Sequence, residues 1–232
     1  MNLIVISELF PPEETSTAYI MGEITKTLSD KYNVTIVCGP EVYDQNKLTV
    51  LPKSSLIAGV TTIRVKGIKE NKANKLSRIR KFLLMSWRLY KASKKVINKG
   101  DKVLLVSNPF PLLILMAFHR KKMDYEISFL AHDLFPEPLL MRFKLPNLVY
   151  RQCLNIFNRS YARMDKIISL GRDMTDVLRE KTMPYNPNLE IIQIENWGDI
   201  NSIYPMDTHS DSDKITIEYA GNMGKSQKLD AL

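Results

Sequence analysis

Short runs of β-branched and aliphatic residues alternate along the chain with longer segments of mixed polarity. The first run, Asn2–Ser7, opens the sequence, and most later runs end in a glycine, an asparagine or an aspartate. Such runs are typical of strands that are buried on both faces of a parallel sheet. We expect seven of these strands, at Asn2–Ser7, Asn33–Gly39, Val60–Gly67, Asp101–Asn108, Tyr125–Asp133, Asp165–Gly171 and Leu189–Trp197.

The segments between these runs carry helical signals. Apolar residues recur at helical spacing from Ile20 to Leu28, after the capping candidates Thr15, Ser16 and Thr17. Further helices are expected over about 74–98, from Pro109 onwards, over about 147–164 and over 172–181. This alternation predicts an α/β fold with a Rossmann-like, doubly wound, mainly parallel seven-stranded sheet.

The polar residues that end the predicted strands are the first candidates for chemistry. Right-handed crossovers bring the loops that follow parallel strands to one edge of the sheet, where ligands bind in folds of this class. The residues expected at this edge are Ser7, Glu8, Gly39, Asn108, His132, Asp133, Gly171 and Asn196.

Two loops at this edge carry side chains that suit a sugar substrate. In "AHDLFPE", His132 and Asp133 end a strand and Glu137 follows. A titratable histidine beside a carboxylate can exchange protons or hydrogen bonds with a substrate hydroxyl, although such a pair can also simply cap the turn. In "FPPEETST", Glu13 and Glu14 offer carboxylates to sugar hydroxyls, and the alternative is a solvated acidic loop.

The character of the chain changes after Trp197. The segment "GDINSIYPMDTHSDSDK" contains a proline and many small polar residues, which is typical of a linker. A fresh strand is expected at Ile215–Asn222. We therefore predict one domain at 1–198, a linker at 199–213, and the first strand and loop of a second domain at 214–232.

The loop in "YAGNMGK" follows that last strand and precedes a helix. Gly221 and Gly224 allow the backbone to approach a phosphate, while the helix N-terminus offers free N–H groups and a positive dipole end. Lys225 adds a positive charge. The alternative is an ordinary junction between a strand and a helix.

The net charge of +8 is concentrated in one segment. Between Lys69 and Lys99 lie eleven lysines and arginines and a single acid, Glu70, while the rest of the chain is nearly neutral. The pattern predicts an amphipathic helix with a core stripe formed by Ile79, Phe82, Leu83, Leu89, Val96 and Ile97.

A basic amphipathic helix that also carries aromatic residues suits an anionic membrane surface. The candidate membrane residues are Lys81, Trp87, Arg88, Lys91, Lys94 and Lys95. A solvated basic face is the alternative. Nucleic acid is not expected as a partner, because the aromatic residues lie on a helix and no nucleic-acid motif is present.

Other classes of function lack their sequence signals. The sequence contains no nucleophile elbow, no P-loop lysine motif and no metal-ligand cluster, so no metal is expected. No apolar run approaches the roughly 20 residues that cross a bilayer. Cys38 and Cys153 show no disulfide or metal spacing, and we expect buried free thiols in a cytosolic protein.

Five runs taken together resemble the glycosyltransferase family 4 enzymes of bacterial capsule and O-antigen synthesis. In chain order they are "NLIVISELFPPE", "VTIVCGPEVYDQNKL", "AHDLFPE", "IENWGDINSIYP" and "IEYAGNMGKSQKLDAL". The strongest match is "YAGNMGKSQKLDAL", and the resemblance covers essentially the whole chain. In the first loop, Thr15 and Ser16 stand where the family usually has a pair of glycines.

The resemblance implies the N-terminal half of a GT-B fold, in which two Rossmann-like domains face each other across a cleft. Such enzymes retain the stereochemistry of the sugar, need no metal or cofactor, and use a nucleotide sugar as the donor substrate, here expected to be a UDP-sugar. His132 and Asp133 would be catalytic. The donor would be bound by Gly221, Asn222, Gly224 and Lys225, and the acceptor by Glu13, Glu14, Thr15, Ser16, Asn108 and Glu137.

The resemblance also implies partners and a location. The acceptor would be a lipid-linked sugar, and the protein would be cytoplasmic, bound peripherally to the anionic inner face of the plasma membrane. The family's basic residue and paired glutamates lie further along the donor domain, so we expect this chain to be inactive without that domain or a second chain that carries it. The alternative is a non-catalytic membrane-docking or acceptor-binding module.

Overall fold

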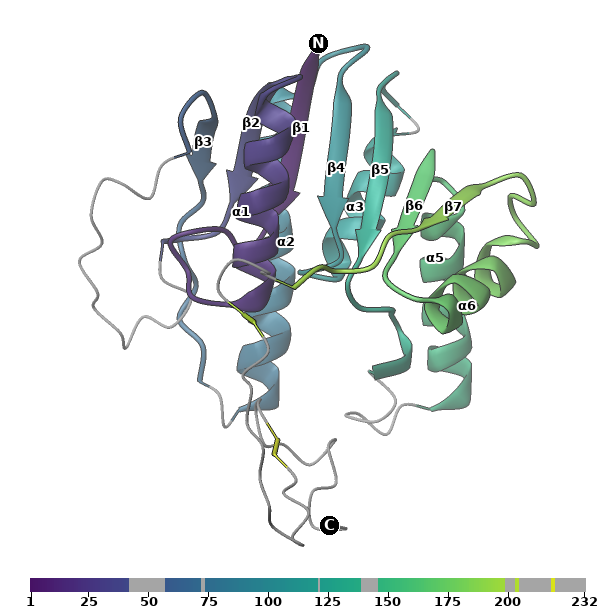
Figure 1. The fold of residues 1–232 in the computed structure, drawn as a ribbon. Coiled ribbons are helices and arrows are strands. Elements are labelled where there is room, and N and C mark those ends of the chain that lie inside the picture. The colour runs from purple at the N-terminus through teal and green to yellow at the C-terminus, as the bar shows by residue number, and fades with distance from the viewer. Residues whose placement is uncertain are drawn as a thin grey trace, which may run out of the picture. The chain divides into compact units, whose positions relative to one another are not determined.

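The structure, a computed structural model, describes most of the chain (Figure 1). Its contacts divide the chain into two units, Met1–Asn196 and Trp197–Leu232, and the described helices and strands all belong to the first unit. The predicted linker at 199–213 and second-domain start at 214–232 lie almost wholly outside the described residues. The described residues are 1–41, 57–71, 74–120, 122–138, 146–198, 203–204 and 218–219.

Seven parallel strands form one sheet in the first unit (Figure 1). Their order is β3-β2-β1-β4-β5-β6-β7, and every neighbouring pair runs in the same direction. The predicted Rossmann-like α/β fold is thereby confirmed. The strands are β1 (Asn2–Ser7), β2 (Asn33–Cys38), β3 (Thr61–Arg64), β4 (Lys102–Val106), β5 (Glu126–Ala131), β6 (Lys166–Ser169) and β7 (Glu190–Gln193).

The described helices cover the sheet unequally. One helix, α1 (Ser16–Ser29), packs on one face through a small apolar cluster that includes Met21. The larger cluster on the other face joins the sheet to α2 (Lys75–Val96), α3 (Pro111–Arg120), α5 (Asn147–Tyr161) and α6 (Arg172–Thr182). Among the residues that the structure describes, no helix is long and apolar enough to cross a bilayer.

The continuous apolar runs follow from this two-sided burial. Successive side chains of a strand point to opposite faces, so Leu3 and Val5 enter the cluster under α1, whereas Ile4 and Ile6 enter the larger cluster. Most strands end a few residues before the predicted boundary. The polar residues that close each run, such as Asn108 after β4, lie in the loops at the carboxyl edge of the sheet.

Candidate active site at the carboxyl edge of the sheet

The strand order reverses between β1 and β4, and ligands bind at such switch points in open α/β sheets. Backbone hydrogen bonds join the loops that follow the neighbouring strands. The backbone N–H of Glu8 donates to the carbonyl of Asn108 at 3.4 Å, and that of Gly39 donates to the carbonyl of Glu8 at 3.0 Å. The carboxyl edge of the sheet is therefore organised around Glu8.

Glu8 carries a buried carboxyl group. The residue is 2% exposed, and neither of its carboxylate oxygens has a hydrogen-bond partner among the described residues. Burial raises the pKa of Glu8 to about 7, although the ammonium of Lys81, 4.0 Å away, acts in the opposite direction. Near neutral pH this carboxyl group therefore gains and loses a proton.

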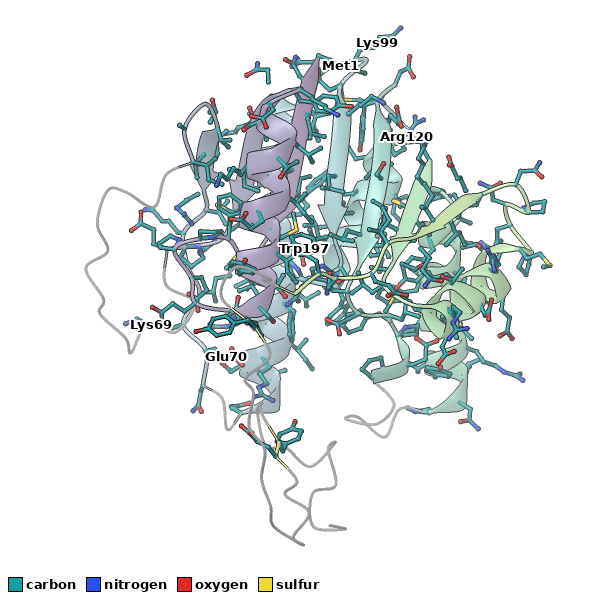
Figure 2. The ribbon with its side chains drawn as sticks, viewed as in Figure 1. Met1, Lys69, Glu70, Lys99, Arg120 and Trp197 are labelled. Atoms are coloured by element: carbon teal, nitrogen blue, oxygen red, sulfur yellow. The ribbon has the colours of Figure 1, made fainter. Side chains whose placement is uncertain are left out.

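Lys81 links this carboxyl group to a second one. Its Nζ atom donates to Oε2 of Glu70 at 3.1 Å, and Arg78 also bonds to Glu70 at 3.0 Å. Figure 2 shows Glu70 towards the carboxyl ends of the strands, whereas Lys99 and Arg120 lie towards the amino ends. Because Lys81 is 4% exposed, it does not belong to a membrane-facing surface, and that prediction for Lys81 is wrong.

Gly39 allows the loops after β1 and β2 to approach closely. A Cβ atom on Gly39 would lie 2.4 Å from the carbonyl oxygen of Glu8, a distance that real Cβ contacts do not show. Arg64 then ties the same loops together, because its guanidinium donates to the carbonyls of Gly39 and Pro11. The edge near Glu8 is thus held by backbone contacts from three strands.

His132 lies in the loop after β5. Its ring is half-buried, and its Nε2 atom is buried without a hydrogen-bond partner in the part of the chain that the structure describes. Burial lowers the pKa of His132 below its usual range, although the charge of Asp133 acts in the opposite direction. The ring is therefore neutral at pH 7 and can donate or accept a hydrogen bond, while Asp133 beside it is exposed.

The structure places the predicted acceptor residues at the same edge, but two of them already contact other parts of the protein. Thr15 caps α1, because its Oγ1 atom accepts from the N–H of Ala18 at 3.2 Å. Glu137 forms an ion pair with Lys181 of α6. The remaining acceptor candidates keep some exposure, half-buried at Glu13 and Asn108 and exposed at Glu14 and Ser16.

The exposed side of α2 differs from the predicted one. Leu89 and Ile97 are buried as expected, but Leu83 is 54% exposed and Ile79 is 38% exposed. The core face is instead completed by Met85. The exposed stripe begins with apolar residues and ends with lysines, comprising Leu76, Ile79, Arg80, Leu83, Leu84, Trp87, Lys91, Lys94 and Lys95.

Five of the six predicted membrane residues remain candidates. Trp87 is 49% exposed, with the Nζ atom of Lys91 at 6.0 Å from its ring centroid. Arg88 is half-buried and donates to the carbonyls of Lys66 and Gly67 at 2.7 and 2.9 Å, so it fastens α2 to the segment after β3. Lys94 and Lys95 are exposed, like Lys91.

The remaining predicted features concern the donor loop, a metal site and the two cysteines. Gly221, Asn222, Gly224 and Lys225 of the predicted donor loop are not among the described residues. Over the described part of the chain, no group of three or more metal-binding side chains is assembled. Both cysteines are free; Cys153 is half-buried, and burial raises the pKa of Cys38 to about 11.

Of two buried polar residues at this edge, one was expected there and the other was not. Glu8 was expected at the edge, but no sequence signal indicated that its carboxyl group would be buried without a hydrogen-bond partner. Ser107 was missed, and its Oγ atom accepts hydrogen bonds from the backbone N–H groups of His132 and Asp133. Ser107 is the first polar residue after the apolar run that ends at Val106, and that position could have indicated it.

Comparisons with known proteins find one relative in sequence and several solved structures of similar fold. No family model matches the chain. A probable glycosyltransferase, WbjE of Pseudomonas aeruginosa, is 24% identical over 243 residues, which cover 99% of this chain and 58% of that protein. The chain therefore spans less than two thirds of the length of this relative.

Two solved structures share the fold at low sequence identity. The N-terminal domain of trehalose-6-phosphate phosphatase from Candida albicans superposes with a TM-score of 0.59 at 11% identity, covering 87% of this chain and 49% of that one. A trehalose-6-phosphate protein from E. coli, bound with UDP-2-fluoro glucose, gives 0.52 at 14% identity, covering 83% and 48%. The structures show the fold alone, and the relative in sequence is described as a probable glycosyltransferase.

Proposed function

We propose that the chain is the acceptor-binding half of a retaining glycosyltransferase of family 4. The enzyme transfers a sugar from a nucleotide donor, a UDP-sugar, to a lipid-linked acceptor during synthesis of a capsule or O-antigen. It works without a metal, in the cytoplasm, at the inner face of the plasma membrane. The observation that carries the proposal is the unpartnered Nε2 atom of His132 at the carboxyl edge, in a chain similar to WbjE.

The chemistry of this edge suits a sugar hydroxyl. A neutral imidazole whose Nε2 atom lacks a protein partner can donate to or accept from a hydroxyl group of the transferred sugar, and Asp133 lies next to it in sequence. In the proposed reaction, the bond between the anomeric carbon and the donor diphosphate breaks. The acceptor oxygen bonds to the same face of that carbon, and its proton leaves with the diphosphate.

The donor is assigned to the second unit. Gly221, Asn222, Gly224 and Lys225 would hold its diphosphate through backbone N–H groups and one positive charge. The E. coli protein of the same fold was solved with UDP-2-fluoro glucose, which supports a UDP-sugar for this chain as well. Residues of a donor domain, on this protein or on a second chain, would stabilise the departing diphosphate.

The exposed stripe of α2 supports a membrane-bound acceptor. Its first half presents Leu76, Leu83, Leu84 and Trp87, and its second half presents lysines. Apolar side chains that enter the boundary of the acyl chains, together with lysines that attract anionic headgroups, are the two elements of interfacial binding. The same stripe is also the observation that favours the second candidate, a membrane-docking module without catalytic activity.

Sugar transfer tests the first candidate. In the protein as its gene encodes it, His132→Ala is expected to reduce release of UDP from UDP-glucose or UDP-N-acetylglucosamine about 100-fold or more, in the presence of a polyprenyl-diphosphate-linked sugar. His119→Gln is the control, because it removes a buried histidine that bonds to Tyr125 away from this edge. Full activity of folded His132→Ala would remove His132 from the mechanism.

Vesicle binding tests the membrane assignment. Changing Lys91, Lys94 and Lys95 to glutamine is expected to weaken binding to phosphatidylglycerol vesicles and to reduce its sensitivity to salt. A matched triple variant at the exposed Lys26, Lys31 and Lys122 alters the net charge equally and is expected to bind like the unmodified protein. Equal binding of the unmodified protein to phosphatidylcholine vesicles would contradict the electrostatic account.

A further inference from the structure

The segment 132–137, which carries His132 and Asp133, is held by buried polar groups from three different elements. Ser107, directly after β4, contacts its start. Tyr161, at the end of α5, contacts its middle, and Lys181 of α6 contacts its end through Glu137. These three residues are 2%, 0% and 6% exposed, so each contact has at least one buried partner.

Ser107 has the most direct connection to His132. Its Oγ atom accepts the backbone N–H of His132 at 3.2 Å and that of Asp133 at 3.1 Å. Its own backbone N–H donates to the carbonyl of Leu130 in β5 at 3.1 Å. One hydroxyl group, fixed to the sheet by its own backbone, therefore sets the orientation of two consecutive peptide units.

The other two contacts hold the segment further along. The hydroxyl of Tyr161 accepts the N–H of Phe135 at 3.0 Å and donates to the carbonyl of the same residue at 3.3 Å. The ring of Phe135 stacks on that of Phe110, with 4.6 Å between the ring centroids. These contacts fix the segment after the two peptide units, whereas Ser107 contacts the backbone at His132 itself.

The contrast between this backbone and the His132 ring points to a function. The N–H groups of His132 and Asp133 both have partners, yet the Nε2 atom of the ring is buried without one. A ring nitrogen without a protein partner, beside backbone N–H groups that have one, is available to an external group.

We propose that Ser107 is a positioning residue that aims the imidazole of His132 at the bound sugar. The proposal rests on the proposed function for the identity of the ligand. Without the hydroxyl, the two N–H groups lose their acceptor, and the peptide units rotate towards water. Such a rotation displaces the ring, and a displacement of about 1 Å at a reacting group can reduce the rate about 100-fold.

The test compares hydroxyl deletions at two buried serines. Ser107→Ala removes the acceptor, while Ser86→Ala removes a hydroxyl of α2 that bonds only to the carbonyl of Phe82, four residues earlier in its helix. Ser107→Thr keeps the hydroxyl. The readout is the NMR signal of the His132 ring during a pH titration, which is simple to assign because the chain contains three histidines.

We expect Ser107→Ala to raise the pKa of His132 towards the ordinary histidine value and to speed amide exchange at His132 and Asp133 by roughly tenfold. Ser86→Ala and Ser107→Thr should leave both unchanged. In the transfer assay, Ser107→Ala should lower kcat about 100-fold with little change in KM for the UDP-sugar. Should Ser107→Ala fail to fold, Ser107→Cys replaces the hydroxyl by a poor acceptor of similar size.

An unchanged His132 titration and unchanged amide exchange in folded Ser107→Ala would overturn the proposal, even if the enzyme transfers sugar. The proposal is also overturned if Ser107→Thr behaves like Ser107→Ala, because the hydroxyl would then not be the determinant. Failure of the proposed function has a different signature. The unmodified protein would transfer no sugar, while the NMR comparison of the variants would remain fully informative.

Discussion

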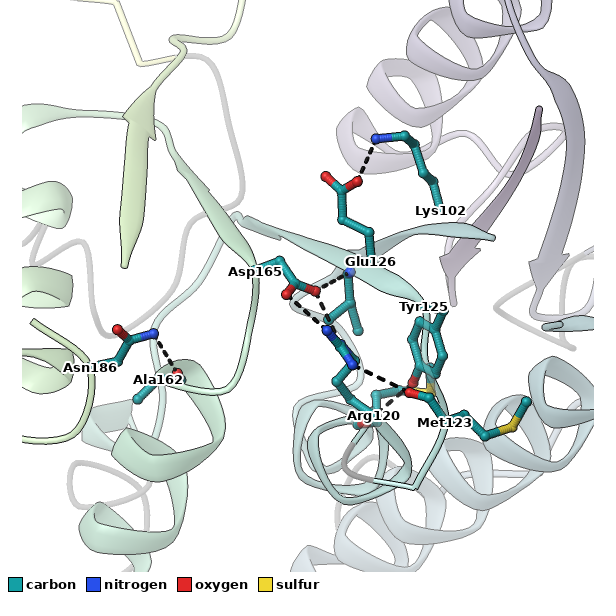
Figure 3. Close-up of polar contacts among 10 residues, drawn as sticks. Lys102, Arg120, Met123, Tyr125, Glu126, Ala162, Asp165 and Asn186 are labelled. Atoms are coloured by element: carbon teal, nitrogen blue, oxygen red, sulfur yellow. Dashed lines mark hydrogen bonds and ion pairs between the residues drawn. The ribbon is translucent and has the colours of Figure 1, made fainter. Parts of the chain in front are cut away.

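At the amino edge of the sheet, charged groups of neighbouring elements meet one another (Figure 3). Arg120 bonds to both carboxylate oxygens of Asp165, at 3.2 and 3.1 Å, and Asp165 also accepts the N–H of Ile127 at 2.7 Å. Lys102 and Glu126 pair across β4 and β5. At the carboxyl edge, by contrast, both carboxylate oxygens of Glu8 and the Nε2 atom of His132 have no hydrogen-bond partner.

Polar residues therefore serve two purposes on this sheet: those at the amino edge pair with one another, and those at the carboxyl edge keep atoms available. Pairs such as Lys102–Glu126 join strands that are already neighbours, so they support the fold and present little for a ligand to bind. Buried polar atoms without partners cost stability, and proteins retain them mainly where they serve a function. Away from the carboxyl edge, the described residues include one titratable side chain with such an atom, His119, whose Nδ1 atom bonds to Tyr125 at 3.2 Å.

The largest expected effect comes from removing the cation at the carboxyl edge. At pH 8, Lys81→Met removes the ammonium that stabilises the charged form of the buried Glu8, and it also deprives Glu70 of a partner. Breaking a buried pair in this way costs about 3–5 kcal/mol in the free energy of unfolding, measured by urea denaturation.

Lys91→Met, on the exposed stripe of the same helix, is the control and should change that free energy by less than about 0.5 kcal/mol. The cost of Lys81→Met should shrink at pH 5, where Glu8 is protonated. Equal costs at both pH values would show that Glu8 does not depend on Lys81.

The next largest effect is a pH dependence of opposite sign at the two edges. The pKa of Glu8 rises from 4.5 to about 7 on folding, so the unfolded chain releases this proton first as the pH increases. Stability from Glu8 is therefore present below pH 4.5 and lost as the pH rises through 7, by about 3 kcal/mol. Glu8→Gln should abolish this decline in urea denaturation at successive pH values.

His119 supplies the opposing control for this prediction. Burial lowers the pKa of His119 below 6.5, so its contribution is present above that pH and lost as the pH falls. His119→Gln should flatten the acid side of the stability profile and leave the decline between pH 4.5 and 7 in place. If Glu8→Gln and His119→Gln changed the stability on the same side of the pH profile, the distinction between the two edges would be contradicted.

The smallest effect concerns the paired edge. Asp165→Asn weakens the contact with Arg120 and is expected to cost about 2 kcal/mol, because hydrogen bonds to charged groups contribute about 1.5–3 kcal/mol. Glu190→Gln, which breaks an exposed pair with Lys166, should have a smaller effect than Asp165→Asn, because solvent screens that pair. Neither variant should alter the NMR titration of His132, and a change there would show that the two edges are coupled.

Much of the architecture was predictable from local patterns. The runs that became β1 and β4 are apolar on both faces, and such runs between helical segments permit few arrangements other than a parallel sheet. The location of His132 and Asp133 at the carboxyl edge was also predictable, because both follow a strand and all strands of a parallel sheet end at the same edge.

The face that α2 presents was not predictable to the same degree. Leu83 and Ile79 fit a helical apolar stripe as well as Met85 does, and only packing against α3 and the sheet decides which side of the helix is buried. The burial of Lys81 illustrates the same limit. A lysine in a basic segment is usually solvated, and this one is buried because Glu8 and Glu70 come from elsewhere in the chain.

By itself, then, the sequence determined the order of strands and helices, the edge at which the chemistry gathers and the resemblance to a transferase. These depend on periodicity and on residues close together in the chain. Only the tertiary structure decided that Glu8 is buried without a hydrogen-bond partner, that Ser107 holds the peptide units at His132, and which stripe of α2 is exposed. Each of these depends on contacts between distant segments, and their energies come from burial and hydrogen-bond geometry that no local pattern contains.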